Sequence, residues 1–201
     1  MSELSMRPTT AMLETIEAEY LYAYLSQAPS GVREHLGMTE TRIGGGVAVA
    51  MRNNPVSIFS KALGFTEPVG GGLVDQVVDF YRAHRTPTAM IQVAPSAMPA
   101  DWEAICASHQ REPAGSQIKL AAPVAQLRCH TESRLRVEPV SAGDAQEWGT
   151  VVMEGFGIQS VSLVRFLSAT VGQPGLTPSA FGTVTTWSPE PISSYTVGSP
   201  P

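Results

Sequence analysis

The sequence predicts an α/β fold in which a mixed sheet is flanked by helices. Between residues 72 and 122, helical and strand-like patterns alternate, which favours an α/β layer over a helical bundle. The 201 residues are 43% hydrophobic and 15% charged, so the chain can bury a core. A polar, irregular stretch at 123–133 is the best boundary along the chain, and it predicts two lobes.

Three helices are expected before this boundary. Residues 11–27 carry apolar side chains mostly at three- and four-residue steps, with Glu14, Glu17 and Glu19 on more polar faces. The Pro-Ser-Gly sequence that follows ends the helix. Residues 72–84 have a second apolar face. A third helix is expected to begin at Pro99, because proline suits the first helical position.

Three strands and one short helical turn complete the first part. Residues 41–52 alternate valine and isoleucine with small residues, and the triple glycine 44–46 interrupts them. Residues 57–63 are expected to form the helical turn. Residues 90–94 are nearly all apolar, as in a strand that is covered on both faces. Apolar residues alternate again in 116–122, which predicts the third strand.

Beyond the boundary we expect a strand, two helices and a hairpin. In order, these are a strand at 135–137, a helix from 145 to about 155, a helix from 160 to 172, and a hairpin of 181–187 with 191–197. Ser141 and Asp144 have the spacing of a capping box, with aspartate in place of glutamate. Ser160 is expected to cap the second helix, and a glycine ends it.

Charge and composition exclude several classes of protein. The net charge is −5 and no basic stripe with interleaved aromatic residues occurs, so nucleic acid is not an expected partner. No apolar run approaches the roughly 18–20 residues that span a bilayer, and the first ten residues do not resemble a signal peptide. We therefore expect no membrane partner and a cytoplasmic location. The two cysteines fit a reducing compartment, and the four histidines share no metal-ligand spacing.

Five stretches of the sequence carry a resemblance to a known family. They are RIGGGVAVAMRNNP, KALGF, LVDQVVDFYRAH and IQVAPSAMPADWEAIC before the boundary, and LRVEPVSAGDAQEWGTVVMEGFG after it. In these stretches the chain is similar to two-lobed actinobacterial members of the GNAT superfamily of acyl-CoA N-acetyltransferases. The resemblance implies a degenerate GNAT-like lobe at residues 1–128, a linker at 129–133, and the first half of a second GNAT-like lobe at 134–201.

The resemblance also implies where the cofactor would bind. In this family a lobe runs strand, helix, helix, strand, strand, and the next strand and helix hold the cofactor. The family motif is Gln/Arg-x-x-Gly-x-Gly/Ala at a strand-to-helix turn, where successive backbone N–H groups bind the diphosphate of coenzyme A. Residues 42–47 and 146–151 nearly match, but each ends in valine. We therefore expect the second lobe to be truncated before the acetyl-CoA motif, and the motif to be absent.

Two triple glycines are the weak candidates for cofactor binding. They are Gly44, Gly45 and Gly46 in the first run and Gly70, Gly71 and Gly72 in the second. The first run lies inside a strand-like segment, where a bulge or a close strand crossing is the better interpretation. The second run leads into a helix and could bind an anion. No strand is expected before it, which favours a flexible linker.

The acceptor site is expected from analogy alone. Relatives have their acceptor-substrate cleft at the junction of the first two helices, which here implies Glu154, Phe156 and Ile158. A glycine-capped helix end explains the same residues without a substrate. No catalytic residue and no metal ligand can be named from the sequence.

The resemblance implies an N-acetyltransferase-like protein that transfers an acetyl group from acetyl-CoA to an amine, while a general base removes a proton from the amine. Because the motif is missing, we expect this chain to be catalytically incomplete. The alternative is a non-catalytic remnant, or a binding or regulatory partner that uses its exposed sheet edge. A lobe that lacks its central strands favours a homo-oligomer or a partner chain that covers that edge.

Overall fold

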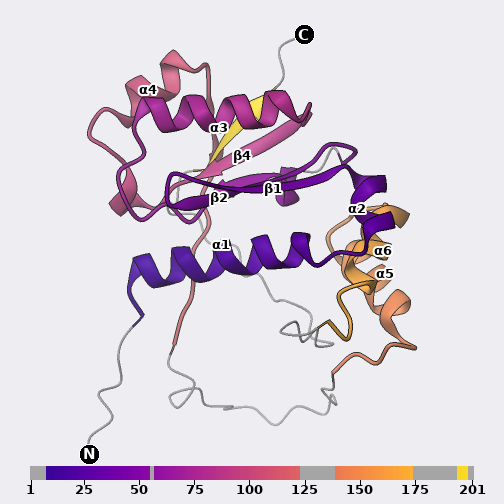
Figure 1. Ribbon diagram of the computed structural model, residues 1–201. Coiled ribbons are helices and arrows are strands. Elements are labelled where there is room, and N and C mark those ends of the chain that lie inside the picture. The colour runs from indigo at the N-terminus through magenta and orange to yellow at the C-terminus, as the bar shows by residue number, and fades with distance from the viewer. Residues whose placement is uncertain (1–7, 55–56, 123–138, 174–193, 199–201) are drawn as a thin grey trace, which may run out of the picture.

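The computed structural model describes residues 8–54, 57–122, 139–173 and 194–198, which form one mixed sheet with helices on both faces (Figure 1). In chain order the elements are α1 Thr10–Ser26, α2 Ser30–Leu36, β1 Met38–Ile43, β2 Gly46–Met51, β3 Lys61–Leu63, α3 Gly71–Ala83, β4 Thr88–Gln92, α4 Trp102–Ser108, β5 Glu112–Gly115, α5 Ala145–Gly155, α6 Val161–Ser168 and β6 Ser194–Gly198. Two short 3-10 helices, η1 and η2, cover Ser57–Phe59 and Pro95–Ala97.

Within the described residues the sheet has six strands, in the order β1-β2-β3-β4-β6-β5. β3 and β4 run parallel, with Lys61 opposite Met90 and Ala62 opposite Ile91. The other neighbouring strands are antiparallel. A parallel pair needs a crossover connection, and α3 provides it between β3 and β4. The predicted α/β class, with a mixed sheet and flanking helices, is therefore confirmed.

Different helices cover the two faces of the sheet. α3 and α4 lie on one face, and α1 lies on the other (Figure 1). On the α3 side, β2, β3, β4, α3 and α4 build one buried apolar cluster, which includes Ala48, Ala50, Ala62, Val74, Val77, Val78, Tyr81, Ala89, Ile91, Trp102, Ile105 and Cys106. Burial of this apolar surface is the main term that holds α3 and α4 on the sheet.

α5 and α6 belong to the α1 side of the molecule. Met153 of α5 and both Leu163 and Phe166 of α6 share a buried apolar cluster with Tyr24 of α1. The rings of Tyr24 and Phe166 meet edge-on, with 4.7 Å between their centroids. The predicted boundary at 129–133 lies outside the described residues, so the division into lobes stays a prediction. The described parts on its two sides nevertheless share one sheet and one apolar cluster.

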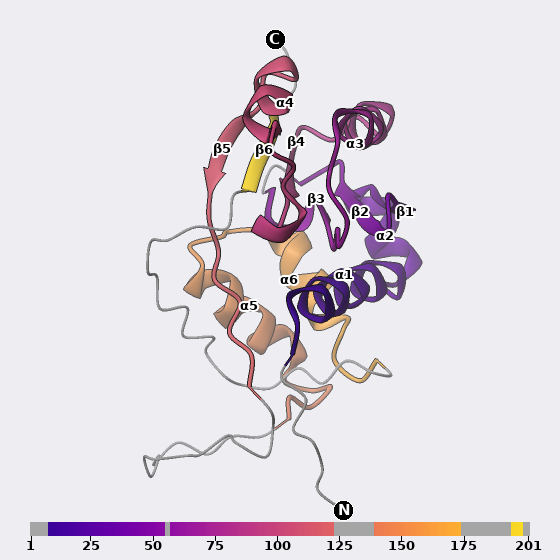
Figure 2. The same cartoon turned by 90° about the vertical axis from the view of Figure 1, so that its left-hand side faces the viewer.

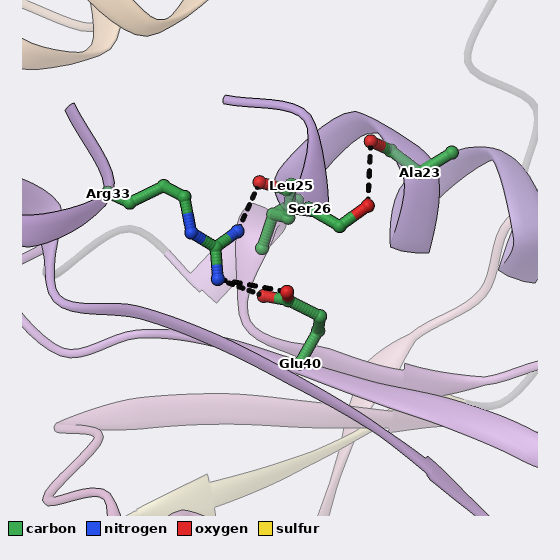
Figure 3. Close-up of polar contacts among 5 residues, drawn as sticks. All are labelled: Ala23, Leu25, Ser26, Arg33 and Glu40. Atoms are coloured by element: carbon green, nitrogen blue, oxygen red, sulfur yellow. Dashed lines mark hydrogen bonds and ion pairs between the residues drawn. The ribbon is translucent and has the colours of Figure 1, made fainter. Parts of the chain in front are cut away.

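Arg33 of α2 joins three consecutive elements at one corner of the fold. Its guanidinium donates to both carboxylate oxygens of Glu40 in β1 at 2.9 Å, and to the Leu25 carbonyl in the last turn of α1 (Figure 3). An arginine near the end of a helix commonly binds these last carbonyl groups. The predicted end of the first helix is confirmed, but a second helix, α2, begins at Ser30 within the sequence expected to be a plain terminator.

The strand predicted at 41–52 is in fact two strands. β1 and β2 form an antiparallel hairpin in which Ile43 lies opposite Gly46. Gly44 and Gly45 make its two-residue turn, with φ angles of 55° and 80°. Two successive positive φ angles belong to the tight turn that matches the twist of a hairpin, and they favour glycine. The bulge expected at the triple glycine is therefore wrong, because the chain reverses direction there. The close strand approach that was expected as the other interpretation is present at Gly46, where a Cβ would lie 2.4 Å from the Leu63 carbonyl oxygen of β3.

Short elements account for the other differences in the first part. The residues expected to form a helical turn at 57–63 form η1 and then β3. The strand predicted at 116–122 is wrong, since the strand in this region is β5, which ends before it. Ile118 and Leu120 are 54% and 88% exposed, so the alternating apolar pattern has no buried face to match it. α4 begins at Trp102, about one turn later than expected.

Both helices predicted beyond the boundary are confirmed as α5 and α6. The hydroxyl oxygen of Ser141 accepts from the N–H of Asp144 at 3.3 Å, and that of Ser160 accepts from the N–H of Leu163 at 3.3 Å. Ser160 therefore caps α6 as expected. The capping box expected at Ser141 is wrong, because the N-cap residue of α5 is Asp144, which makes no side-chain cap, and Ser141 lies in the turn before it. Outside the described residues lie the predicted strand at 135–137 and the predicted hairpin strand at 181–187. The other hairpin strand falls largely in β6, which lies between β4 and β5 and pairs with both, so its predicted pairing in a hairpin is wrong.

Candidate functional site

The second glycine run forms an uncapped helix start. Gly70 is the N-cap residue of α3 and has an extended backbone, with no side-chain hydrogen bond to the helix and no acidic residue in the first turn. Its carbonyl accepts from the N–H groups of Leu73 and Val74 at 3.0 and 3.2 Å. The N–H groups of Gly71 and Gly72 have no acceptor within the described ranges. Such N–H groups, together with the helix dipole, attract an anion.

The space around these glycines is open. A Cβ atom built on Gly70, Gly71 or Gly72 would meet no atom within 4 Å. The first glycine run is different, because a Cβ on Gly44 would lie 2.4 Å from a methyl carbon of Leu73, in the first turn of α3. The structure therefore brings the two predicted glycine runs together, with the hairpin turn packed beside the helix start.

A strand does precede the second run. β3 ends at Leu63, and seven residues of loop lead from it to α3. The expectation that no strand comes before these glycines is wrong, because β3 has only three residues and gives no visible alternation. In this strand–turn–helix context, residues 67–72 fit the family motif at Gly70 and Gly72, and they depart from it at Glu67, where the motif has Gln or Arg. Glu67 is exposed.

Both ends of the connecting loop are held in place. Gly64 has a φ of 87°, and a Cβ built on it would lie 2.4 Å from the Cβ of Ala18 in α1, so only glycine allows this close approach. At the other end, the N–H of the buried Val69 donates to the Ala97 carbonyl at 2.9 Å. The helix start is thus fixed before any ligand arrives, which lowers the entropy cost of binding.

A group of charged side chains lies on the α1 side of the sheet, where sequence reasoning placed no site. We call Glu14, Glu17, Lys61, Gln92 and Lys119 the charge network. The ammonium group of Lys119 lies 2.6 Å from Glu14 Oε1 and 2.6 Å from Glu17 Oε2. Gln92 Nε2 donates to the same oxygen of Glu17 at 2.9 Å. The side chain of Glu14 is only 3% exposed, although it was expected on a polar face.

Burial affects two members of the charge network, Glu14 and Lys61. Glu14 Oε2 is buried and has no hydrogen-bond partner in the part of the chain that the structure describes. Leaving a buried polar atom in this state costs about 1–3 kcal/mol. Burial lowers the pKa of Lys61, the neighbouring charge of Lys119 lowers it further, and Glu17 opposes both effects. These are features of a site that holds charge away from water.

Glu154, Phe156 and Ile158 lie at the end of α5. Glu154 and Phe156 are exposed, and Ile158 packs partly against the apolar cluster that α5 shares with α1. The N–H of Phe156 donates to the carbonyls of Val152 and Met153, and Gly157 has a φ of 68°, as at a capped helix end. α5 and α3 lie on opposite sides of the sheet, so these three residues are not brought together with the glycine runs (Figure 1).

One further hollow contains none of the predicted site residues. Its volume is about 510 Å³, and its lining residues are Arg33, Glu34, Gly37, Met38, Thr39, Arg52, Ala83, His84 and Arg85. The arginine of Figure 3 is already bound to Glu40 and Leu25. Over the described ranges, no three His, Cys, Asp or Glu side chains are placed to hold a metal ion.

Comparison with known proteins finds no match: no protein-family model, no curated protein and no solved structure is similar to this chain. Among the helices that the structure describes, none is both long enough and apolar enough to cross a membrane.

Proposed function

We propose that the protein binds acetyl-CoA at Gly70–Gly72 and is an N-acetyltransferase-like protein of the GNAT type. One observation carries the proposal. β3, the glycine turn and α3 follow α1, α2, β1 and β2, which is the order that the resemblance gives for this family from its first helix onward. The opening strand of the family order has no counterpart among the described residues, which begin at residue 8. The sequence suggested the family order for residues 134–197, which lack a cofactor segment. In residues 10–83, β3, the glycine turn and α3 stand in the place of that segment.

The chemistry of the helix start supports the same ligand. The diphosphate of coenzyme A offers oxygen acceptors, and the N–H groups of Gly71 and Gly72 are donors without acceptors in the described residues. Because no Cβ covers the backbone at these positions, phosphate oxygens can approach it closely. When bound, acetyl-CoA would supply an acetyl thioester to an acceptor amine. We assign no residue as the base that removes the amine proton.

Glu67 favours the alternative that the protein binds no cofactor. Its exposed carboxylate stands where the family motif has Gln or Arg, and a negative charge there repels a diphosphate. A non-catalytic protein of this fold would act through its surfaces. The sheet has one edge at β1 and one at β5, and all residues of β5 are exposed. A partner strand or a second copy could pair with either edge.

Calorimetric titration of the folded protein with acetyl-CoA separates the two functions. We expect saturable one-site binding that weakens at least tenfold when Gly70, Gly71 and Gly72 are all replaced by alanine, since three methyl groups would cover the backbone donors. Gly155→Ala is the matched control, because Gly155 is also a helical glycine with open space around it. Absence of binding by the folded wild-type protein would contradict the proposal and leave the non-catalytic alternative.

A further inference from the structure

We propose that Glu14 and Glu17 form a binding site for the primary ammonium group of an amine, and that Lys119 of this chain occupies the site in the structure. The inference rests on the proposed function in one respect: if the protein is an acetyltransferase, the bound amine is the acceptor of the acetyl group. The site itself follows from the charge network. Its chemistry is that of an alkylammonium ion held between two carboxylates.

The two carboxylates are set in fixed positions. Glu14 and Glu17 are three residues apart on α1, so both side chains lie on one face of the helix. Gln92 of β4 donates to Glu17 and orients its carboxylate from the sheet. Glu14 is buried by the packing of α1 on the sheet. An ammonium group that enters therefore meets two charged acceptors already in place, each at 2.6 Å from Lys119 Nζ here.

One acceptor of the site remains unused when Lys119 occupies it. Glu14 Oε2 has no hydrogen-bond partner in the described ranges, although the other oxygen of the same carboxylate holds the lysine. An ammonium group has three N–H donors. The chain fixes where the nitrogen of Lys119 can lie, whereas the nitrogen of a small free amine can move toward this oxygen and donate to it as well. The unused buried oxygen thus points to a ligand other than Lys119.

The segment that supplies Lys119 can be displaced without unfolding the sheet. After β5 the chain runs past α1, which Lys119 contacts through Glu14 (Figure 2). Lys119 is the one residue of 116–122 that is not exposed. The segment contains no helix or strand, so exchange of Lys119 for a ligand ammonium breaks no sheet pairing. The contact spans 105 residues of sequence and links this segment to α1.

Charge and composition support a site for an ammonium ion. The chain has two lysines, Lys61 and Lys119, beside eleven arginines, and both lysines belong to the charge network. Two carboxylates and two ammonium groups balance each other there. Removal of the Lys119 side chain leaves one negative charge in excess in a partly buried place, which a compact alkylammonium ion can neutralise.

The site also adjoins the loop that leads to the glycine turn. Gly64 begins that loop, and a Cβ built on it would lie 3.4 Å from the Glu14 carbonyl oxygen. The turn of α1 that carries Glu14 is therefore in contact with the chain that holds Gly70–Gly72. An amine in this site lies on the α1 side of the same β3–α3 connection.

The test is rescue of Lys119→Ala by an added amine. We expect K119A to melt at a lower temperature than the wild-type protein, and n-butylamine near neutral pH to raise the melting temperature of K119A by about 3 °C or more. Tetramethylammonium chloride at the same concentration is the control, because it has the same charge and no N–H donor. In the double variant with Glu17→Gln, the response to n-butylamine should disappear.

Each outcome decides the question. If n-butylamine stabilises K119A no more than tetramethylammonium does, Lys119 is a plain ion-pair partner and the inference is wrong. If K119A does not fold by itself, the same titration is followed by circular dichroism. Recovery of the helical signal with n-butylamine but not with tetramethylammonium supports the inference, and no recovery with n-butylamine contradicts it. Binding of acetyl-CoA by K119A without an amine response would overturn this inference alone. An amine response without acetyl-CoA binding would support the site and contradict the proposed function.

Discussion

The chain has two runs of three glycines, and the fold uses them in opposite ways. At Gly44–Gly46 the backbone needs glycine, because the turn has positive φ angles and Cβ atoms at the first and third positions would collide with Leu73 and Leu63. At Gly70–Gly72 the φ angles are ordinary and the surroundings are empty. Glycines of the first kind are explained by folding. Folding does not require glycine at the positions of the second run. The absence of side chains there either leaves room for a ligand or has no role.

The largest expected effect tests the crowded run. In Gly46→Ala the new methyl carbon would lie 2.4 Å from the Leu63 carbonyl oxygen, a backbone atom that can move only if β2 and β3 separate. We expect a loss of about 3 kcal/mol in the free energy of unfolding, measured by urea denaturation. A loss below about 1 kcal/mol would show that the hairpin and β3 can move apart easily, and that folding does not require glycine at position 46.

Gly44→Ala should have a smaller effect. Its methyl group would meet the end of the Leu73 side chain, which can rotate away, so the positive φ of 55° is the main cost. We expect a loss of about 1–2 kcal/mol in the same measurement. Gly44→Asn is the informative control, because asparagine tolerates this backbone conformation better and should recover part of the loss. Equal losses in both variants would mean that contact with Leu73 dominates.

The third prediction concerns charge at the open run. Glu67→Arg replaces the residue that departs from the family motif, and the exposed position should leave stability unchanged. We expect the affinity for acetyl-CoA to rise about fivefold to tenfold, because a repulsive charge becomes an attractive one. The gain should shrink as salt is added. Titrations at two ionic strengths measure both effects, and an unchanged affinity would place the diphosphate elsewhere.

The smallest effect has the opposite sign. Gly72→Ala should raise the free energy of unfolding by about 0.5 kcal/mol, since alanine favours the helix and nothing obstructs its methyl group. Gly155→Ala in α5 should give a similar gain. If Gly72→Ala stabilises the protein while acetyl-CoA binding falls, the glycine is retained for the ligand. If Gly72→Ala destabilises the protein, the new methyl group meets an obstruction, and the two glycine runs do not differ in the space around them.

The fold could be predicted where the sequence signal is long. α1, α3, α5 and α6 have two or more turns of recurring apolar residues, and their positions along the chain follow from these. In α1 the apolar face itself was predicted only in part, because Ile16 and Tyr20 are exposed while Glu14 and Ala18 are buried. β3, with three residues, and α2, with seven, are too short for any period to be visible. At 116–122 the alternation is present, but period alone does not say whether a face will be buried, and Leu120 is 88% exposed. Adjacent glycines between two strand-forming runs, residues 39–43 and 47–51, were a usable hairpin signal that the bulge interpretation overlooked.

The candidate sites divide in the same way. Gly70–Gly72 could be named from sequence because the glycines are contiguous, but their interpretation depended on β3. The charge network could not be found, since Glu14 and Lys119 are 105 residues apart and each is an ordinary surface residue type by itself. Burial, rather than residue type, makes Glu14 unusual, and burial depends on how α1 settles on the sheet.

Arg33 has a consequence for the order of folding. Its partners, Leu25 and Glu40, lie within eight residues of it along the chain, so this corner closes only short loops. β4 and β6, in contrast, pair across about a hundred residues. Contacts of short range form with the smaller entropy cost, and topologies rich in them fold faster. The α1–α2–β1 corner can therefore assemble during synthesis, before β6, the last strand of the chain, pairs with β4 and β5 at the other end of the sheet.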